Sequence, residues 1–188
     1  MLFRSDDPTH GQQQLIFFHG YYKQYQYLVR AITCAENDLV VLPALLYGTA
    51  DPALGVGLDL ERIVDALREK FPHVVIHVRA DSGYAKPWFY RVCERLGVLY
   101  SIGFGMNKVL KRNSEELLKT AVEEQERTGQ SQRLFTGFDC QAGTWEQPRW
   151  IVIKCEANAQ GTNRRAVVTN RPGVRTVQIG RASCRERG

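Results

Sequence analysis

The chain has 188 residues, of which 44% are apolar, and a formal net charge of +5 at pH 7. This length supports one packed core and is too short to expect two. The pI near 9.0 suits a protein that meets polyanions, although many basic proteins bind no nucleic acid. No stretch approaches the roughly 20 apolar residues that span a bilayer, and the first residues lack the apolar core of a signal peptide. We therefore expect a cytoplasmic protein that is neither exported nor inserted in a membrane.

The cysteines and histidines do not form a metal-binding pattern. The five cysteines are odd in number and widely spaced, without a CxxC pair. The histidines have neither an i, i+4 helical partner nor cysteine neighbours at zinc spacing. These residues are Cys34, Cys93, Cys140, Cys155 and Cys184, with His10, His19, His73 and His77. We expect reduced thiols and structural histidines. Because no GxxxxGK(S/T) motif is present, we expect no nucleotide cofactor either.

Aromatic and β-branched runs dominate the first fifty residues. The runs over 14–22, 27–36 and 39–48 predict three consecutive antiparallel strands, the first two joined by a hairpin connection over 20–26. Proline cannot donate a hydrogen bond to a neighbouring strand, so Pro43 predicts a break or an edge position in the third strand.

Helices and strands alternate in the middle of the chain. Apolar residues recur at helical spacing in one segment and continue without interruption in the next, which predicts a helix and then a central strand covered on both faces. A second helix that ends at Gly97 and a further strand follow. The predicted ranges are 59–71 and 86–97 for the helices, and 74–81 and 99–105 for the strands.

The last third begins with a segment rich in Glu, Lys and Leu. Residues 107–130 predict an amphipathic helix whose charges form a solvated face. Three β-rich segments follow, at 133–141, 149–158 and 164–170, and the loops between them predict antiparallel pairing. The chain is therefore predicted to be an α/β protein with the element order βββ, α, β, α, β, α, βββ.

The most informative acidic residue is Asp81, which follows the predicted central strand and precedes Ser82 and Gly83. In open α/β sheets, the carboxyl ends of the strands border the crevice in which ligands bind. A carboxylate there can hold a divalent metal ion, but phosphodiester chemistry with two ions needs more than one such group. An aspartate in this place is more often a turn or N-cap residue. Position alone therefore leaves both roles open.

Three segments, in the same order, resemble one protein family. They are DDPTHGQQQLIFFHGYY, VRADSGYAKPWFYRVCERLGVLYSIGFGMN and WIVIKCEANAQGTNRRAVVTN. They resemble bacterial insertion-sequence transposases of the DDE type (transposase DDE domain, group 1), and the resemblance extends over residues 6–172. It implies an RNase H-like mixed sheet (βββαβαβ) with an additional antiparallel β segment near the C-terminus.

The resemblance also implies a catalytic centre of two aspartates and a glutamate. In the family these residues bind two Mg²⁺ (or Mn²⁺) ions, and a water or a DNA 3′-hydroxyl attacks a phosphodiester at the transposon end. By position, Asp81 corresponds to the second acidic residue. Phe3 occupies the place of the first, so we expect the first acidic strand to be cut away from this chain. Asp6 and Asp7 remain nearby, either as metal ligands or as the start of an ordinary turn.

The third acidic residue should lie on a helix after the segment 164–170. The chain has no glutamate on a long helix there. Residues 178–188 resemble the translation of a common sequencing adapter, so we interpret them as a non-native tail. The chain is thus interpreted as a transposase domain truncated at both ends.

Basic residues near these motifs are candidates for contacts with DNA. Arg79 flanks Asp81 and suits a phosphate as well as a neighbouring acid. The better candidates for the DNA backbone open the helix predicted over 107–130. They are Lys108, Lys111 and Arg112.

Two hypotheses about function follow. The first is a fragment of a DDE transposase whose full-length form, expected to be a homodimer, cuts and joins DNA with Mg²⁺. The second is a catalytically inactive remnant that acts at most as a basic DNA-binding module. Because one acidic residue of three is retained, we predict that the 188-residue chain itself does not cleave DNA.

Overall fold

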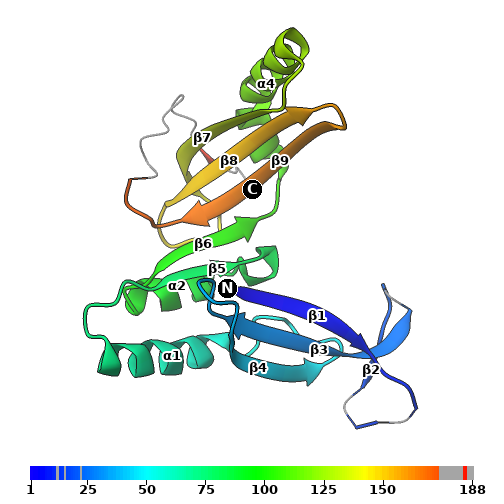
Figure 1. Cartoon of the computed structure of the whole chain (residues 1–188), viewed down its shortest axis with the longest axis vertical. Helices are drawn as coiled ribbons and strands as arrows, with labels where there is room; N and C mark the ends of the chain where they lie inside the picture. Colours follow the sequence, from blue (N-terminus) through cyan, green and yellow to red (C-terminus); the bar gives the residue numbers. More distant parts are fainter. Residues whose placement is uncertain (12, 15, 22, 174–183, 186–188) are drawn as a thin grey trace. The chain divides into compact units, whose positions relative to one another are not determined.

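The chain forms two compact units, Met1–Val98 and Leu99–Gly188, where its length suggested one core. The computed structural model describes residues 1–11, 13–14, 16–21, 23–173 and 184–185. Strands and helices occur in both units (Figure 1). The protein is therefore a mixed α/β protein, as the sequence predicts.

The first unit begins with a run of strands and continues with alternating helix and strand. Its elements are β1 (Leu2–Pro8), β2 (Phe17–His19), β3 (Gln24–Thr33), β4 (Val40–Tyr47), α1 (Val56–Lys70), β5 (His77–Ala80), η1 (Ser82–Tyr84) and α2 (Pro87–Arg95). β2, β3 and β4 confirm the three predicted consecutive strands, and α1, β5 and α2 confirm the alternation after them. β2 is much shorter than the aromatic run that predicted it.

β1 is a strand that the sequence pattern did not predict. It pairs antiparallel with β3 along its whole length and parallel with β5, where Leu2 is the partner of Ala80. The segment in which we expected the first acidic strand to be cut away therefore contains a strand, and the correspondence of Phe3 to the family's first aspartate stays a prediction. The segment LFRSDDP escaped detection because it lacks the regular alternation of apolar and polar residues that marks a half-buried strand.

β3 lies at the centre of this part of the sheet. The strand order is β4, β3, β1, β5, and β2 pairs with the first residues of β3. Within the described residues β4 pairs with β3 alone, so Pro43 has the edge position that was predicted, opposite Ala31. Leu28 and Ile32 on β3 are buried and contribute to the core.

The two helices of the first unit follow their sequence signals closely. α1 buries Val56, Leu60 and Val64, which recur every four residues on one side of the helix. α2 has proline at its first turn and ends where predicted, because Gly97 adopts a positive φ of 61° and Val98 N donates to Cys93 O at 3.0 Å.

β5 differs from its prediction. The strand has four residues instead of the eight predicted, and Val75, which precedes it, is 76% exposed. The apolar run 74–81 therefore does not form one continuous, doubly covered strand. Only Val78 of β5 is buried.

The second unit is an antiparallel sheet with helices on one side. Its elements are β6 (Leu99–Phe104), α3 (Lys108–Asn113), α4 (Glu115–Thr128), β7 (Gln132–Gln141), β8 (Arg149–Asn158), β9 (Gly161–Thr169) and β10 (Cys184–Arg185). The strand order is β10, β7, β8, β9, β6, and only β10 pairs parallel to its neighbour. The predicted antiparallel segments at 133–141, 149–158 and 164–170 are thus confirmed.

The helix predicted over 107–130 is divided in two at Ser114. This serine is buried, and its hydroxyl donates to Leu110 O at 2.8 Å, at the point where α3 ends and α4 begins. Gly129 ends α4 with a positive φ of 70°. No helix in the described part of the chain is long and apolar enough to cross a membrane.

Candidate active site

Asp81 lies at the carboxyl end of β5, as the sequence predicts, and caps the short helix η1. Its backbone is extended (φ −76°, ψ 179°), and its Oδ1 accepts a hydrogen bond from Gly83 N at 2.7 Å. The residue is exposed. The structure therefore shows the capping role directly and also leaves the carboxylate accessible to a ligand.

Gly83 gives the Asp81 carboxylate the room that it needs. A Cβ at this position would lie 2.9 Å from Asp81 Oδ1 and 3.2 Å from Pro52 Cγ. A larger residue would therefore have to displace either the carboxylate or the loop that contains Pro52. The conformation of Asp81 depends on a small neighbour.

The loop that contains Pro52 is held by a buried arginine. Arg30, on β3, is 2% exposed; its guanidinium forms an ion pair with Asp59 of α1 and donates to the carbonyl oxygens of Pro52 and Leu54. A buried cation needs such partners, because an uncompensated charge in the interior is costly. Arg30 therefore links the sheet, α1 and the loop that packs on Gly83.

A second ion pair connects the same loop to the segment after Asp81. Lys86 Nζ lies 3.0 Å from Asp51 Oδ2, and both side chains are partly exposed. Neither this pair nor the role of Arg30 was predicted from the sequence. A charged residue within the apolar run YLVRAIT was the available signal for Arg30.

The parallel pairing of β1 with β5 lies next to Asp81 in sequence. Leu2 and Ala80 are partners in the parallel pair, and Phe3 and Asp81 are the residues that follow them in sequence. Neighbouring strands are about 4.8 Å apart, so residues that follow a strand pair can lie close enough for their backbones to be neighbours. This is the arrangement in which two carboxylates can share a metal ion.

Asp6 and Asp7 lie further along β1. Asp6 is three residues beyond position 3, about 10 Å along the strand, and its Oδ1 accepts a hydrogen bond from Gln26 Nε2 at 2.9 Å. Asp7 is exposed and one residue further away. The structure thus does not bring either residue next to Asp81, and metal ligation by them stays a prediction.

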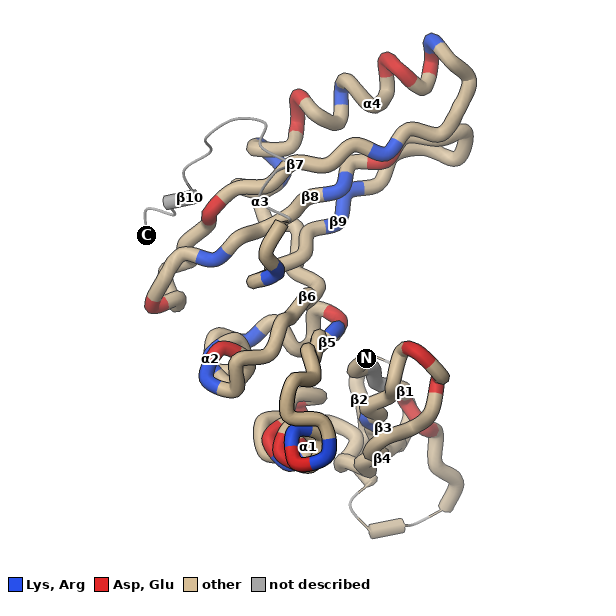
Figure 2. Tube along the Cα trace, turned by 60° about the vertical axis from the view of Figure 1, so that its left-hand side comes forward, with Lys and Arg blue, Asp and Glu red and all other residues tan. Residues whose placement is uncertain are grey.

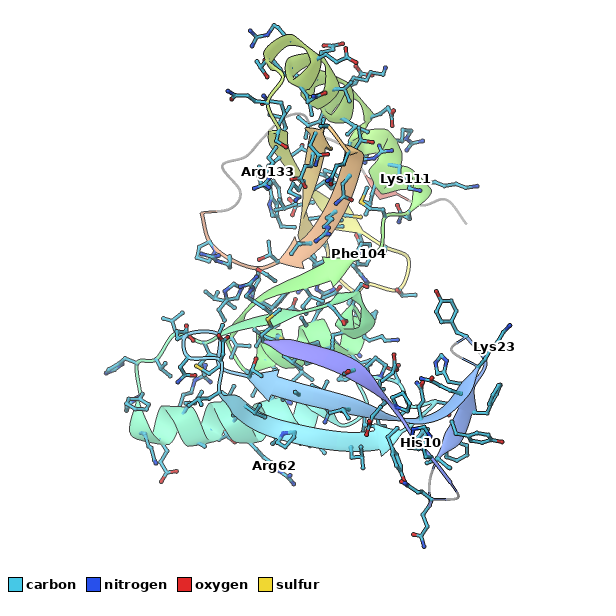
Figure 3. The ribbon with its side chains drawn as sticks, turned by 45° about the vertical axis from the view of Figure 1, so that its right-hand side comes forward. His10, Lys23, Arg62, Phe104, Lys111 and Arg133 are labelled. Atoms are coloured by element: carbon cyan, nitrogen blue, oxygen red, sulfur yellow. The ribbon has the colours of Figure 1, made fainter. Side chains whose placement is uncertain are left out.

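The candidate DNA-binding residues are all exposed. Arg79 is exposed on β5, two residues before Asp81. Lys108, Lys111 and Arg112 are exposed on α3, and Lys111 is labelled in Figure 3. Asn107 begins α3 by accepting a hydrogen bond from Leu110 N at 2.9 Å, and Arg164 of β9 donates to Lys111 O at 2.9 Å. These contacts fix the helix from which the three cations project.

The donor set for a metal ion is incomplete. Within the described residues, no group of three or more His, Cys, Asp or Glu residues is placed to hold a metal ion. Asp81 supplies one carboxylate, whereas a two-ion centre needs several carboxylate oxygens. The described residues therefore do not fit a two-metal site.

These features define a class: a mixed α/β protein with an exposed carboxylate at the end of a strand that runs parallel to the first strand. The family model for the transposase DDE domain, group 1, matches residues 2–188, so the chain belongs to this family. Its members are transposases, which bind DNA and generally use divalent metal ions. The match includes 178–188, which lie almost entirely outside the described residues, and the adapter-like origin of that tail stays a prediction.

Among solved structures, the chain is similar to a piggyBac transposase, in a cryo-EM structure of its synaptic complex with hairpin DNA. The sequence identity is 12% and the TM-score is 0.46, over 91% of this chain and 32% of that chain. The chain thus spans about a third of the length of that protein. A comparison with curated proteins found no match.

Proposed function

We propose that this chain is a catalytic-domain segment of a bacterial insertion-sequence DDE transposase, whose complete form cleaves and joins DNA at transposon ends. The observation that carries the proposal is the position of Asp81 at the end of β5, one residue after Ala80, which pairs with Leu2 of the parallel strand β1. Two adjacent strand positions at one sheet edge suit a pair of metal-binding carboxylates. Asp81 is then the second acidic residue of the catalytic centre.

An RNase H-like core is the fold we propose for the first unit. The strand order β4, β3, β1, β5, with antiparallel β4, β3 and β1 and parallel β5, supports this topology. In such a sheet the first strand lies between the second and the fourth. Here β1 corresponds to the first strand, β3 to the second and β5 to the fourth, and β1 lies between β3 and β5.

The remaining roles follow from position and charge. Mg²⁺ or Mn²⁺ would supply the Lewis acid of the phosphodiester chemistry, with Asp81 as a ligand and Asp6 or Asp7 as more distant candidates. Arg79, Lys108, Lys111 and Arg112 would contact DNA phosphates. The complete enzyme would act as a homodimer in the bacterial cytoplasm.

A catalytically inactive DNA-binding module is the second candidate. The observation that favours it is the single carboxylate at the site, since Phe3 replaces the first aspartate of the family pattern. This module would keep the exposed cations of α3 and lose cleavage. DNA binding without cleavage by the 188-residue chain is the result that we expect from either candidate.

A restored carboxylate separates the two candidates. We expect Phe3→Asp to bind Mn²⁺ at least about tenfold more tightly than the parent chain, because two carboxylates would then meet at one edge. Titration calorimetry or the electron paramagnetic resonance signal of free Mn²⁺ measures this affinity. Asp81→Asn in the Phe3→Asp background should abolish the gain.

Ser5→Asp is the matched control for Phe3→Asp. Ser5 lies on the same strand and the same face, about 7 Å further from Asp81. It adds the same charge without forming the pair, so its Mn²⁺ affinity should stay at the parent value. An equal gain in Ser5→Asp, or a gain that survives Asp81→Asn, would rule out a metal site at Asp81.

A further inference from the structure

One face of the sheet in the second unit is basic and exposed. The pairing of β7, β8 and β9 brings five side chains together on this face, and we call these five residues the basic sheet face. They are Arg133, Phe135, Lys154, Glu156 and Arg165. Figure 2 shows lysine and arginine positions along these three strands.

The opposite face of this sheet is covered by helices. Cys155 Sγ lies 3.6 Å from Ser114 O, and Arg164 forms an ion pair with Glu115 of α4 at 2.8 Å. Cys155 and Arg164 alternate with the residues of the basic sheet face, so they project the other way. The basic sheet face is therefore the side that α3 and α4 leave open.

Three of the five side chains on the basic sheet face are exposed, whereas Lys154 is half-buried and Glu156 is buried. Arg133 has 66% of its side chain exposed, and Phe135, directly opposite Lys154, is 44% exposed. Arg165 is also exposed, and its side chain makes no hydrogen bond or ion pair within the described residues. Arg133 is labelled in Figure 3. An exposed aromatic ring thus lies among three cations.

Two of the cations on this face lie directly opposite each other on neighbouring strands. Lys154 and Arg165 are direct cross-strand partners, and like charges in that position destabilise a sheet. Glu156 is the one carboxylate among the five residues; it accepts from Arg133 Nε at 2.7 Å and from Lys154 Nζ at 2.6 Å. These two hydrogen bonds lower the pKa of Glu156, which keeps it ionised. Within these five residues, three cations against one carboxylate leave an excess of two positive charges, and Asp139 lies on the same face further along β7.

We infer that the basic sheet face binds the phosphodiester backbone of DNA, with Phe135 stacking on a base where the strand is unpaired. Cations that track a backbone, combined with an exposed aromatic ring, are the usual means of holding unpaired nucleic acid. The inference rests on the proposed function for the identity of the polyanion. It adds a DNA-contacting surface that is separate in sequence from the cations of α3.

Salt dependence of DNA binding by the 188-residue chain tests the inference. The probes are a fluorescein-labelled single-stranded 20-mer and the corresponding duplex, with anisotropy measured at several KCl concentrations. Each phosphate contact contributes about 0.9 to the slope of log K against log salt for a duplex, and about 0.7 for a single strand. Lys154→Gln and Arg165→Gln should each reduce the slope by about one such contact and weaken binding several-fold at fixed salt.

Two further variants make the result independent of folding damage. Glu156→Gln removes the negative charge of the face and should strengthen DNA binding, the opposite of what a poorly folded chain would do. Phe135→Leu should weaken binding of the single strand about tenfold and leave the duplex nearly unchanged. Lys119→Gln on α4 is the matched control, since Lys119 has 59% of its side chain exposed and pairs with Glu116.

Three outcomes would overturn the inference. The first is a salt slope that Lys154→Gln and Arg165→Gln leave unchanged, and the second is an equal change in Lys119→Gln. The third is displacement of the DNA probe by poly-glutamate as effectively as by unlabelled DNA, which would indicate an acidic protein partner. The Mn²⁺ measurement on Phe3→Asp is a separate readout. If Phe3→Asp gains no Mn²⁺ affinity while the salt slopes of DNA binding change as expected, the proposed function is contradicted. DNA binding by the basic sheet face is then still supported.

Discussion

The two units of this protein concentrate opposite kinds of charge on their functional features. The first unit presents a carboxylate, Asp81, at a sheet edge, and a buried ion pair of Arg30 with Asp59 holds the neighbouring loop. The second unit has an apolar interior that includes the fully buried Ile151 and Ile153, and it presents its cations on an open sheet face. The proposed function of the first unit therefore depends on the position of one carboxylate. That of the second unit depends on the summed charge of several cations.

The largest expected effect is the loss of the buried ion pair in the first unit. Arg30→Met should lower the free energy of unfolding by about 3–5 kcal/mol, because it leaves Asp59 partly buried without its cation. Urea unfolding followed by circular dichroism measures this change. Arg30→Met combined with Asp59→Leu should recover part of the loss, since an apolar pair of similar volume needs no counter-charge.

A small loss of stability in Arg30→Met would contradict this account of the first unit. If Arg30→Met costs less than about 1 kcal/mol, the pair behaves like a surface ion pair. The loop of Pro52 would then need another support, and the first unit would not depend on a buried charge.

The stability of the second unit should depend most on side-chain packing. A substitution at Gly137 tests this expectation. A Cβ at Gly137 would lie 2.7 Å from the Trp150 ring. Gly137→Ala should therefore destabilise the protein by about 1–3 kcal/mol, as overpacking does. Gly143→Ala is the control, because a Cβ there meets nothing within 4 Å. Equal unfolding midpoints in urea for the two variants would show that the Trp150 ring moves aside at little cost.

The sequence predicted most of what local patterns can specify. Helical spacing located α1, Gly97 located the end of α2, and Pro43 located an edge strand. Asp81 was placed correctly at a strand end because an apolar run, a carboxylate and a small residue follow one another there. Each of these signals lies within a few neighbouring residues.

Features that depend on distant residues were missed. β1 is specified by pairing with β3 and β5 rather than by its own alternation. Arg30 joins residues that are 22 to 29 positions away in sequence, so its burial has no local signal. The basic sheet face needs the register of three strands before its cations can be placed together.

A smaller effect on stability, with a specific effect on Asp81, is expected at Gly83. Gly83→Ala should cost about 1 kcal/mol or less, because the closest atom is the end of a side chain that can rotate. The displaced carboxylate should nevertheless reduce the Mn²⁺ affinity gained by Phe3→Asp. Gly20→Ala, where a Cβ meets nothing within 4 Å, should leave that affinity unchanged. An unchanged affinity in Gly83→Ala would mean that the orientation of Asp81 is not fixed by its hydrogen bond to Gly83.

The smallest expected effect is a difference in reactivity between two thiols, and it is measured on the unmutated chain. Burial raises the pKa of Cys93 in α2 to about 12, so this residue is a neutral thiol at pH 8. The contribution of this neutral thiol to stability is complete at pH values below about 9, the pKa of a cysteine in the unfolded chain. It is lost as the pH rises towards 12. Cys34 is only half-buried. A disulfide reagent at pH 8 should therefore label Cys34 at least about tenfold faster than Cys93.

The buried thiols also report on the two units separately. Cys93 belongs to the first unit and Cys155 to the second, and burial raises the pKa of both. Because a thiol that is buried and protonated reacts only after local opening, its labelling rate measures the stability of its own surroundings. Arg30→Met should therefore accelerate the labelling of Cys93 more than that of Cys155, and Gly137→Ala should do the reverse. Equal acceleration of both thiols by either variant would show that the chain opens as a single cooperative structure.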